Sequence, residues 1–247
     1  MTTMIPAPAT ERRLGLSVRA ELRLNSVRAL TTVLLCAAAL IWAAISTDQF
    51  NGLLTLWAAL AWYRYGRADG IEREELRASL GLSRADRIRG RVVLVLAEQA
   101  AVVATVAAGA VFSVALGRDS AGGAAPFTLS GDPMGPQLGI VLAGALFSMI
   151  CLLVTGLVVG GDCTTRRPGR SLAVLSILTY FLVGLLLTIP LLLVSLILSR
   201  DPWDGAFGTP VVAGLLVGTV VALLVALRAR VRRWIPALDS TAEAVSR

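Results

Sequence analysis

The sequence contains no histidine and no lysine. Without histidine, the chain cannot build a Ser-His or Cys-His catalytic pair, an imidazole zinc site or a histidine-ligated haem. Without lysine, it cannot form the Gly-x-x-x-x-Gly-Lys loop that cradles nucleotide phosphates. We therefore expect that the chain is not an enzyme, does not hydrolyse ATP, and holds no cofactor or metal of its own.

Cysteine is also scarce. Cys36 and Cys151 fall within apolar runs, and Cys163 falls in a short segment that we expect to be a loop. This spacing matches no disulfide or metal framework. We interpret these residues as small apolar filler.

Charged residues make up only 16% of the 247 residues, whereas hydrophobic residues make up 56%. Soluble domains carry about 25% charged residues, and a helix that crosses a bilayer needs about 20 consecutive apolar residues. A buried core helix could account for one such run, but not for all of those in this chain. The sequence therefore predicts an all-α, polytopic membrane protein with six transmembrane helices. No internal repeat is evident, so we expect a single domain over residues 1–247.

The six predicted spans cover about 29–45, 50–65, 91–116, 137–160, 171–198 and 209–227. The second is short, and we interpret its aromatic residues as interfacial anchors: Trp57, Trp62, Tyr63 and Tyr65. As one helix the fifth would be roughly 42 Å long, against a hydrocarbon core near 30 Å. Since Pro190 interrupts it, this helix either tilts and kinks, or ends near Thr188 and gives way to a short second helix that turns back into the membrane. We favour the re-entrant turn.

Residues 11–28 are predicted to form a helix on the membrane surface. Arg12, Arg19 and Arg23 share one face, where they would meet anionic headgroups while neighbouring leucines enter the interface. A simple cytosolic helix before the first span is the alternative. Residues 1–10 lack the basic region and cleavage site of a signal peptide.

All 23 basic residues are arginine, and they gather on one side of the predicted topology. The N-terminal segment, residues 64–91, the 161–170 loop and the C-terminal tail carry 5, 8, 3 and 5 of them, against Arg118 and Arg200 on the other side. The positive-inside rule then predicts that both termini are cytoplasmic. Membrane topology thus accounts for the net positive charge of the chain, and we expect no nucleic-acid partner. The bias toward Arg, Ala, Leu, Val and Gly is typical of a high-GC bacterial genome, so we expect the bacterial plasma membrane.

The one long charged stretch between apolar runs, residues 70–91, has the local chemistry of a helix-turn-helix. Its early glutamates favour the first turns of a helix, where the dipole end is positive. Gly81 would end that helix. Ser83 with Asp86 is typical of a capping box that starts the next helix, which continues into the third span. The alternative is a solvated basic loop that only fixes the topology.

Residues 75–84, with the sequence ELRASLGLSR, lie between the second and third spans. In sequence and position this stretch resembles the coupling helix of ATP-binding cassette (ABC) transporter permeases of the second exporter type, which export drugs, antibiotics or peptides. The whole layout is similar: an elbow helix at 11–28, six spans, a coupling helix at about 70–83 and cytoplasmic termini. The resemblance implies that this helix seats in a partner ATPase and contacts it through Glu74, Glu75, Leu76, Arg77, Leu80, Gly81, Leu82, Ser83 and Arg84.

The resemblance further implies an exporter of a hydrophobic or amphipathic small molecule or peptide. Two copies of a separate ATPase subunit would bind ATP and Mg²⁺, and a second permease chain, identical or homologous, would complete the pathway. Residues 75–81 also have the spacing of the Glu-Ala-Ala…Gly loop of ABC importers, but Leu76 and Arg77 replace the alanines, so an importer is the runner-up. A membrane anchor or sensor that recruits a cytosolic partner without transport, and a membrane enzyme, are the remaining alternatives.

Glu98 and Gln99 lie about seven residues into the third span. An unpaired carboxylate there costs about 2–3 kcal/mol, so Glu98 should face a cavity, pair with an arginine or be protonated. We regard both residues as candidates for a substrate or gating site, and an ion pair with an interfacial arginine as the alternative for Glu98. Weaker candidates, whose hydroxyls more often bond to their own backbone, are Thr155, Ser176, Thr179 and Tyr180. Small residues that would permit close helix packing include Gly109, Gly139, Gly144 and Gly156.

Overall fold

The computed structural model describes the backbone of residues 9–45, 51–66, 79–115, 134–165, 169–198 and 210–245. Apart from turns, these residues are helical, so the predicted all-α class is confirmed. The helices are α1 (Ala9–Leu24), α2 (Ser26–Ile45), α3 (Asn51–Ala59), α4 (Ala61–Gly66), α6 (Arg84–Ala115), α7 (Met134–Thr165), α8 (Arg170–Leu198) and α9 (Pro210–Val245).

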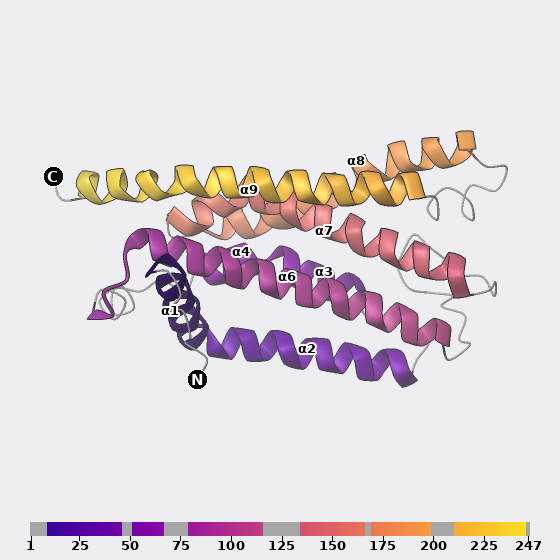
Figure 1. Ribbon diagram of the computed structural model, residues 1–247, viewed down its shortest axis with the longest axis horizontal. Coiled ribbons are helices and arrows are strands. Elements are labelled where there is room, and N and C mark those ends of the chain that lie inside the picture. The colour runs from indigo at the N-terminus through magenta and orange to yellow at the C-terminus, as the bar shows by residue number, and fades with distance from the viewer. Residues whose placement is uncertain are drawn as a thin grey trace, which may run out of the picture.

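The long helices run side by side as a bundle (Figure 1). α6 contacts α2 and α7, and α7 contacts α8 and α9, while the short helices α3 and α4 pack against α6 and α7. α1 crosses the bundle near the start of α6 instead of running along it. α1 and the last turns of α9 lie toward the same end of the bundle, where α6 begins (Figure 1).

Five of the described helices are long and apolar enough to cross a membrane, which makes this a multi-pass membrane protein. They are Ser26–Ile45, Arg84–Phe112, Val141–Thr164, Arg170–Ile189 and Ala213–Pro236. The predicted second span is not a continuous helix. It consists of α3 and α4, which are separated by a turn at Leu60.

The expected re-entrant end of the fifth span is wrong. α8 continues as one helix from Arg170 to Leu198, past Pro190. A proline removes only one backbone donor, and a long helix keeps the remaining hydrogen bonds on both sides of it. Similarly, α7 extends to Thr165, so Cys163 is a fully buried helical residue and not part of a loop.

A pair of tryptophans forms the centre of the largest core cluster. Trp62 of α4 and Trp234 of α9 meet edge to face, with ring centroids 6.0 Å apart. Both rings press against glycines of α7, where Gly156 and Gly160 leave room for them. Trp62 and Tyr65 are only 1% and 2% exposed, so the prediction that they anchor at the lipid interface is wrong. They instead pack α4 between neighbouring helices.

α1 lies directly on the backbone of α6 at Gly90. The Ser17 hydroxyl donates a hydrogen bond to the Asp86 carbonyl, and both Ser17 and Gly90 are buried. A Cβ atom at position 90 would lie 3.1 Å from the carbonyl carbon of Ser17 and 3.2 Å from its Cβ. The glycine is therefore what allows the two helices to approach so closely.

Replacing Gly90 with alanine is expected to destabilise the protein by about 1–3 kcal/mol, because the added methyl group must push α1 away from α6. Gly15→Ala is the matched control, because Gly15 lies on α1, the helix that packs against Gly90, and no atom lies within 4 Å of a Cβ at position 15. Thermal unfolding of the two purified variants in detergent measures the difference. Equal melting temperatures for both variants would contradict the close contact.

Candidate functional site

The backbone ladder between α3 and α4 is interrupted inside the bundle. The last bond of α3 runs from the Leu60 amide to the Leu56 carbonyl at 3.2 Å, and the first bond of α4 runs from the Arg64 amide to the Leu60 carbonyl at 2.9 Å. In a continuous helix, the carbonyls of Trp57 and Ala58 would accept bonds from the amides four residues later. At this break they need other donors, because there is little water inside a membrane bundle.

Two side chains supply those donors. Arg64 Nη2 donates to the Trp57 carbonyl at 2.8 Å, and Gln99 Nε2 of α6 donates to the Ala58 carbonyl at 3.3 Å. Arg64 also brings its positive charge to the carboxyl end of α3, where the helix dipole is negative. The break is thus stabilised by one side chain from α4 and one from α6.

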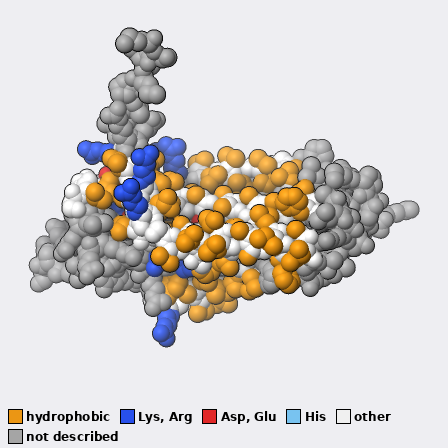
Figure 2. Space-filling view, turned by 90° about the horizontal axis from the view of Figure 1, so that it is seen from below, with side chains coloured by type: hydrophobic (Ala, Val, Ile, Leu, Met, Phe, Trp, Pro, Cys, Tyr) orange, Lys and Arg blue, Asp and Glu red, His pale blue; other side chains and the backbone are white. Residues whose placement is uncertain are grey.

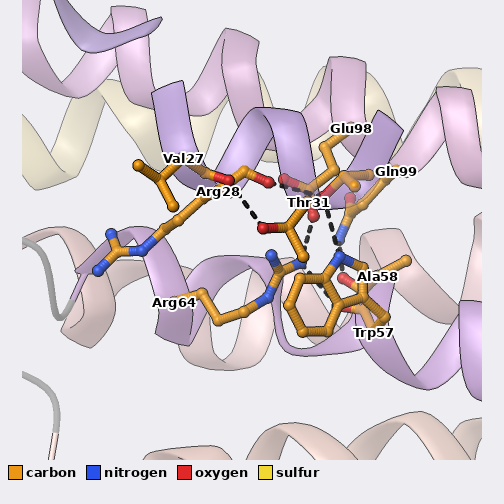
Figure 3. A network of polar contacts seen from close by, with 9 residues as sticks. Val27, Arg28, Thr31, Trp57, Ala58, Arg64, Glu98 and Gln99 are labelled. Atoms are coloured by element: carbon orange, nitrogen blue, oxygen red, sulfur yellow. Dashed lines mark hydrogen bonds and ion pairs between the residues drawn. The ribbon is translucent and has the colours of Figure 1, made fainter. Parts of the chain in front are cut away.

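Arg64 forms a buried ion pair with Glu98 of α6 (Figure 3). The side chains are 12% and 4% exposed, respectively. The guanidinium also lies over the Trp57 ring, with its central carbon 3.7 Å from the ring centroid. Three groups therefore hold the charge of Arg64: a carboxylate, an aromatic face and a backbone carbonyl.

The network extends to α2. Trp57 Nε1 donates to Thr32 Oγ1 at 2.9 Å, and the Thr32 hydroxyl donates to the Arg28 carbonyl at 3.2 Å. These bonds fix the Trp57 ring beneath the guanidinium. Glu98 lies 14 residues after Arg84, or about 21 Å along α6. The site therefore lies well inside the bundle and is built from α2, α3, α4 and α6.

Several buried polar atoms of this network have no hydrogen-bond partner among the described residues. They are Arg64 Nε and Nη1, Glu98 Oε2 and Gln99 Oε1. Glu98 is 7% exposed and Gln99 is fully buried, so solvent does not reach them. Such atoms are costly in a low-dielectric environment. Four such atoms belong to this one network.

The predicted polar residues do not form one site. Glu98 and Gln99 belong to the same network, and Glu98 adopts the alternative in which it pairs with an arginine. The Thr155 and Ser176 hydroxyls donate to carbonyls of their own helices, at 2.8 and 2.7 Å. Tyr180 interacts with Thr55 and Ser148 in a separate cluster. Thr179, also on α8, is half-buried.

The turn predicted at Gly81 is present, and the structure describes the chain from residue 79 onward here. Gly81 adopts a left-handed conformation with φ of 65°, which favours glycine after a helix end. The predicted capping box is confirmed: the Asp86 amide donates to Ser83 Oγ at 3.1 Å, and the Ser83 amide donates to Asp86 Oδ2 at 3.2 Å. Leu80 is 57% exposed, Ser83 and Arg84 are exposed, and Leu82 is half-buried.

The remaining coupling candidates, Glu74, Glu75, Leu76 and Arg77, lie outside the described residues. So does the side chain of Arg12, whereas Arg19 and Arg23 are exposed on α1. On the face in Figure 2, arginine side chains gather at one end of an apolar surface. The exposed arginines near this end come from α1, α6, α8 and α9: Arg13, Arg19, Arg23, Arg84, Arg89, Arg170, Arg228, Arg230, Arg232 and Arg233.

Arg64 and Trp57 are the functional candidates that the sequence interpretation missed. Arg64 was counted only as part of the basic stretch, and Trp57 only as an interfacial anchor. A signal was nevertheless present. Consecutive spans run in opposite directions, so an arginine near the end of the second span and a glutamate early in the third lie at similar depths.

Comparisons of the chain with known protein families, with characterised proteins and with solved structures give no significant match. Support for a function therefore comes from the helix arrangement, the buried charge network and the exposed turn at residues 80–84, here called the elbow and distinct from the predicted elbow helix at 11–28.

Proposed function

We propose that the chain is the transmembrane subunit of an ATP-driven exporter, which moves a hydrophobic or amphipathic small molecule or peptide across the bacterial plasma membrane. The observation that carries the proposal is the buried Arg64–Glu98 pair at a helix break inside a multi-pass bundle. Ionisable groups inside membrane helices are costly and are typical of transport pathways. Broken helices at membrane depth are likewise typical of transporter binding sites.

The exposed elbow supports coupling to a partner. Leu80 places an apolar side chain at the surface beside the sharp turn at Gly81, at the arginine-rich end that we propose is cytoplasmic. From Arg84, α6 continues without interruption past Glu98. A partner that moves the elbow would therefore move Glu98 as part of the same helix. In this proposal the partner is an ABC-type ATPase in two copies, and a second permease chain completes the pathway.

Copurification and transport test this function. We expect the tagged chain to copurify with an ATPase, and the complex to show ATP-dependent movement of an amphipathic probe in liposomes. Leu80→Asp should reduce transport at least about 10-fold, because a charge replaces the apolar contact at the proposed interface. Leu16→Ala and Leu80→Ala form a milder matched pair, since these leucines are 58% and 57% exposed. Of the two, only Leu80→Ala should weaken ATPase binding.

The exposed elbow is also consistent with a second function, that of a membrane anchor or sensor that recruits a cytosolic partner. That function predicts partner binding through Leu80 but no ATP-driven movement of any probe. An importer would move the probe in the opposite direction in vesicles of defined orientation. Unchanged partner binding and transport in Leu80→Asp would refute coupling through the elbow.

A further inference from the structure

The space that Arg64 fills has the composition of a binding site for an organic cation. A carboxylate from Glu98, the face of the Trp57 ring and the Trp57 carbonyl converge on the guanidinium (Figure 3). Each of these groups recognises positive charge attached to N–H groups, and none of them requires that the charge belong to an arginine.

We infer that this is a site for an organic cation of the guanidinium or substituted ammonium type, and that Arg64 is an internal occupant which the ligand displaces. The guanidinium makes its hydrogen bonds through Nη2, whereas Nε and Nη1 have no partner among the described residues. Arg64 therefore leaves part of its hydrogen-bonding capacity unused. A ligand that also uses the unpartnered acceptors would compete with it.

Those acceptors are Glu98 Oε2 and Gln99 Oε1, and the Tyr65 hydroxyl also lies beside the Glu98 carboxylate. Both acceptors belong to side chains more than nine-tenths buried, and both are oxygen atoms that a donor must approach. Cationic N–H groups match them, whereas an anion would be repelled by the carboxylate and a purely apolar group would leave both oxygens unsatisfied. The ligand class is therefore a cation with several N–H groups or, less tightly, an alkylammonium.

The Arg64 side chain can take up another position when a ligand displaces it. Arg64 lies two residues before the end of α4, and α4 lies nearer than α3 to the end of the bundle where α6 begins (Figure 1). A long arginine side chain can extend to the headgroup region and keep its charge solvated. Arg28, the other arginine labelled in Figure 3, extends away from Glu98, so it does not fill the site in place of the ligand.

Displacement would also remove the donor from the Trp57 carbonyl at the end of α3. Ligand binding is thereby linked to the geometry of the helix break and, through Glu98, to α6. Binding of the cation does not depend on the proposed transport function, whereas the conclusion that the cation is cargo rests on it.

Chemical rescue tests the site with the full chain in detergent. The probes are n-butylguanidinium and n-butylurea, which have nearly the same shape but differ in charge. In Arg64→Ala, n-butylguanidinium at about ten times its Kd should raise the melting temperature by about 3–5 °C, and n-butylurea should not. Arg64→Ala/Glu98→Gln should show no shift. The wild type should show a smaller shift than Arg64→Ala, because Arg64 competes for the same groups.

Equal shifts from the two probes, or a shift that survives Glu98→Gln, would overturn the proposal. If Arg64→Ala does not fold, titration of the wild type and Glu98→Gln, followed by tryptophan fluorescence, decides the question. We expect the Kd for n-butylguanidinium to rise at least about 10-fold in Glu98→Gln, and an unchanged Kd would refute the site. Cation binding without any effect on ATP-driven transport would leave the site established and would refute only the cation as cargo.

Discussion

Replacing Glu98 with alanine is expected to lower the free energy of unfolding by about 3–5 kcal/mol, because the variant leaves the Arg64 guanidinium buried without its carboxylate. Arg64→Ala should cost a similar amount, since it leaves Glu98 unpaired and removes the donor to the Trp57 carbonyl. The double variant Arg64→Met/Glu98→Leu should recover most of this loss, because it removes both charges and keeps the volume filled. A double-mutant cycle built from Arg64→Met, Glu98→Leu and the double variant should therefore give a coupling energy of about 2 kcal/mol or more.

Denaturant unfolding of the purified proteins in mixed micelles measures these free energies. Asp162→Ala is the control, since this carboxylate is exposed on α7, and its removal should change stability by less than about 0.5 kcal/mol. Strictly additive single effects of Arg64→Met and Glu98→Leu would mean that the ion pair does not contribute to folding. In that case the helix break would have to be held by packing alone.

Gly160→Leu is expected to destabilise the protein by about 3 kcal/mol, because α7 has no room for a side chain at this position. Even a Cβ atom would lie 2.9 Å from the Trp234 ring and 3.2 Å from the Trp62 ring. Those rings are 7% and 1% exposed, so neither can move aside without disturbing the core cluster. Gly156→Ala should act in the same direction, since its Cβ would lie 2.7 Å from Trp62 Nε1.

Gly184→Leu on α8 is the matched control for this prediction. No atom lies within 4 Å of a Cβ at position 184, and the neighbouring side chains face outward. A leucine there should be tolerated and should gain helix propensity relative to glycine. Similar melting temperatures for Gly160→Leu and Gly184→Leu would show that the tryptophans do not pack on the glycine face of α7.

Local chemistry made some features of the elbow predictable. Ser83 and Asp86 satisfy one another's backbone amides within four residues, and Gly81 can adopt a positive φ at little cost. These effects act within a single turn, so the local sequence is enough to predict them. Gly156 was likewise expected to permit close packing, and it does so against Trp62.

Other features depend on contacts that the local sequence does not contain. No proline or glycine lies between Trp57 and Arg64 to indicate a break at Leu60. Pro190 suggested an interruption of α8, where the helix in fact continues. In both cases, whether the helix continues or breaks depends on whether its backbone groups find hydrogen-bond partners. At Leu60 those partners are side chains from α4 and α6.

The sequence by itself determined that this is a helical, multi-pass membrane protein with its arginines toward one end, because length, apolarity and charge asymmetry are properties of each segment alone. Only the tertiary structure decided that Arg64 and Glu98, 34 residues apart, form one buried pair at a broken helix. The pair exists because α4 and α6 are brought together by packing. In that low-dielectric interior, the two charges and the carbonyls of Trp57 and Ala58 are stable because the side chains of the network give them partners.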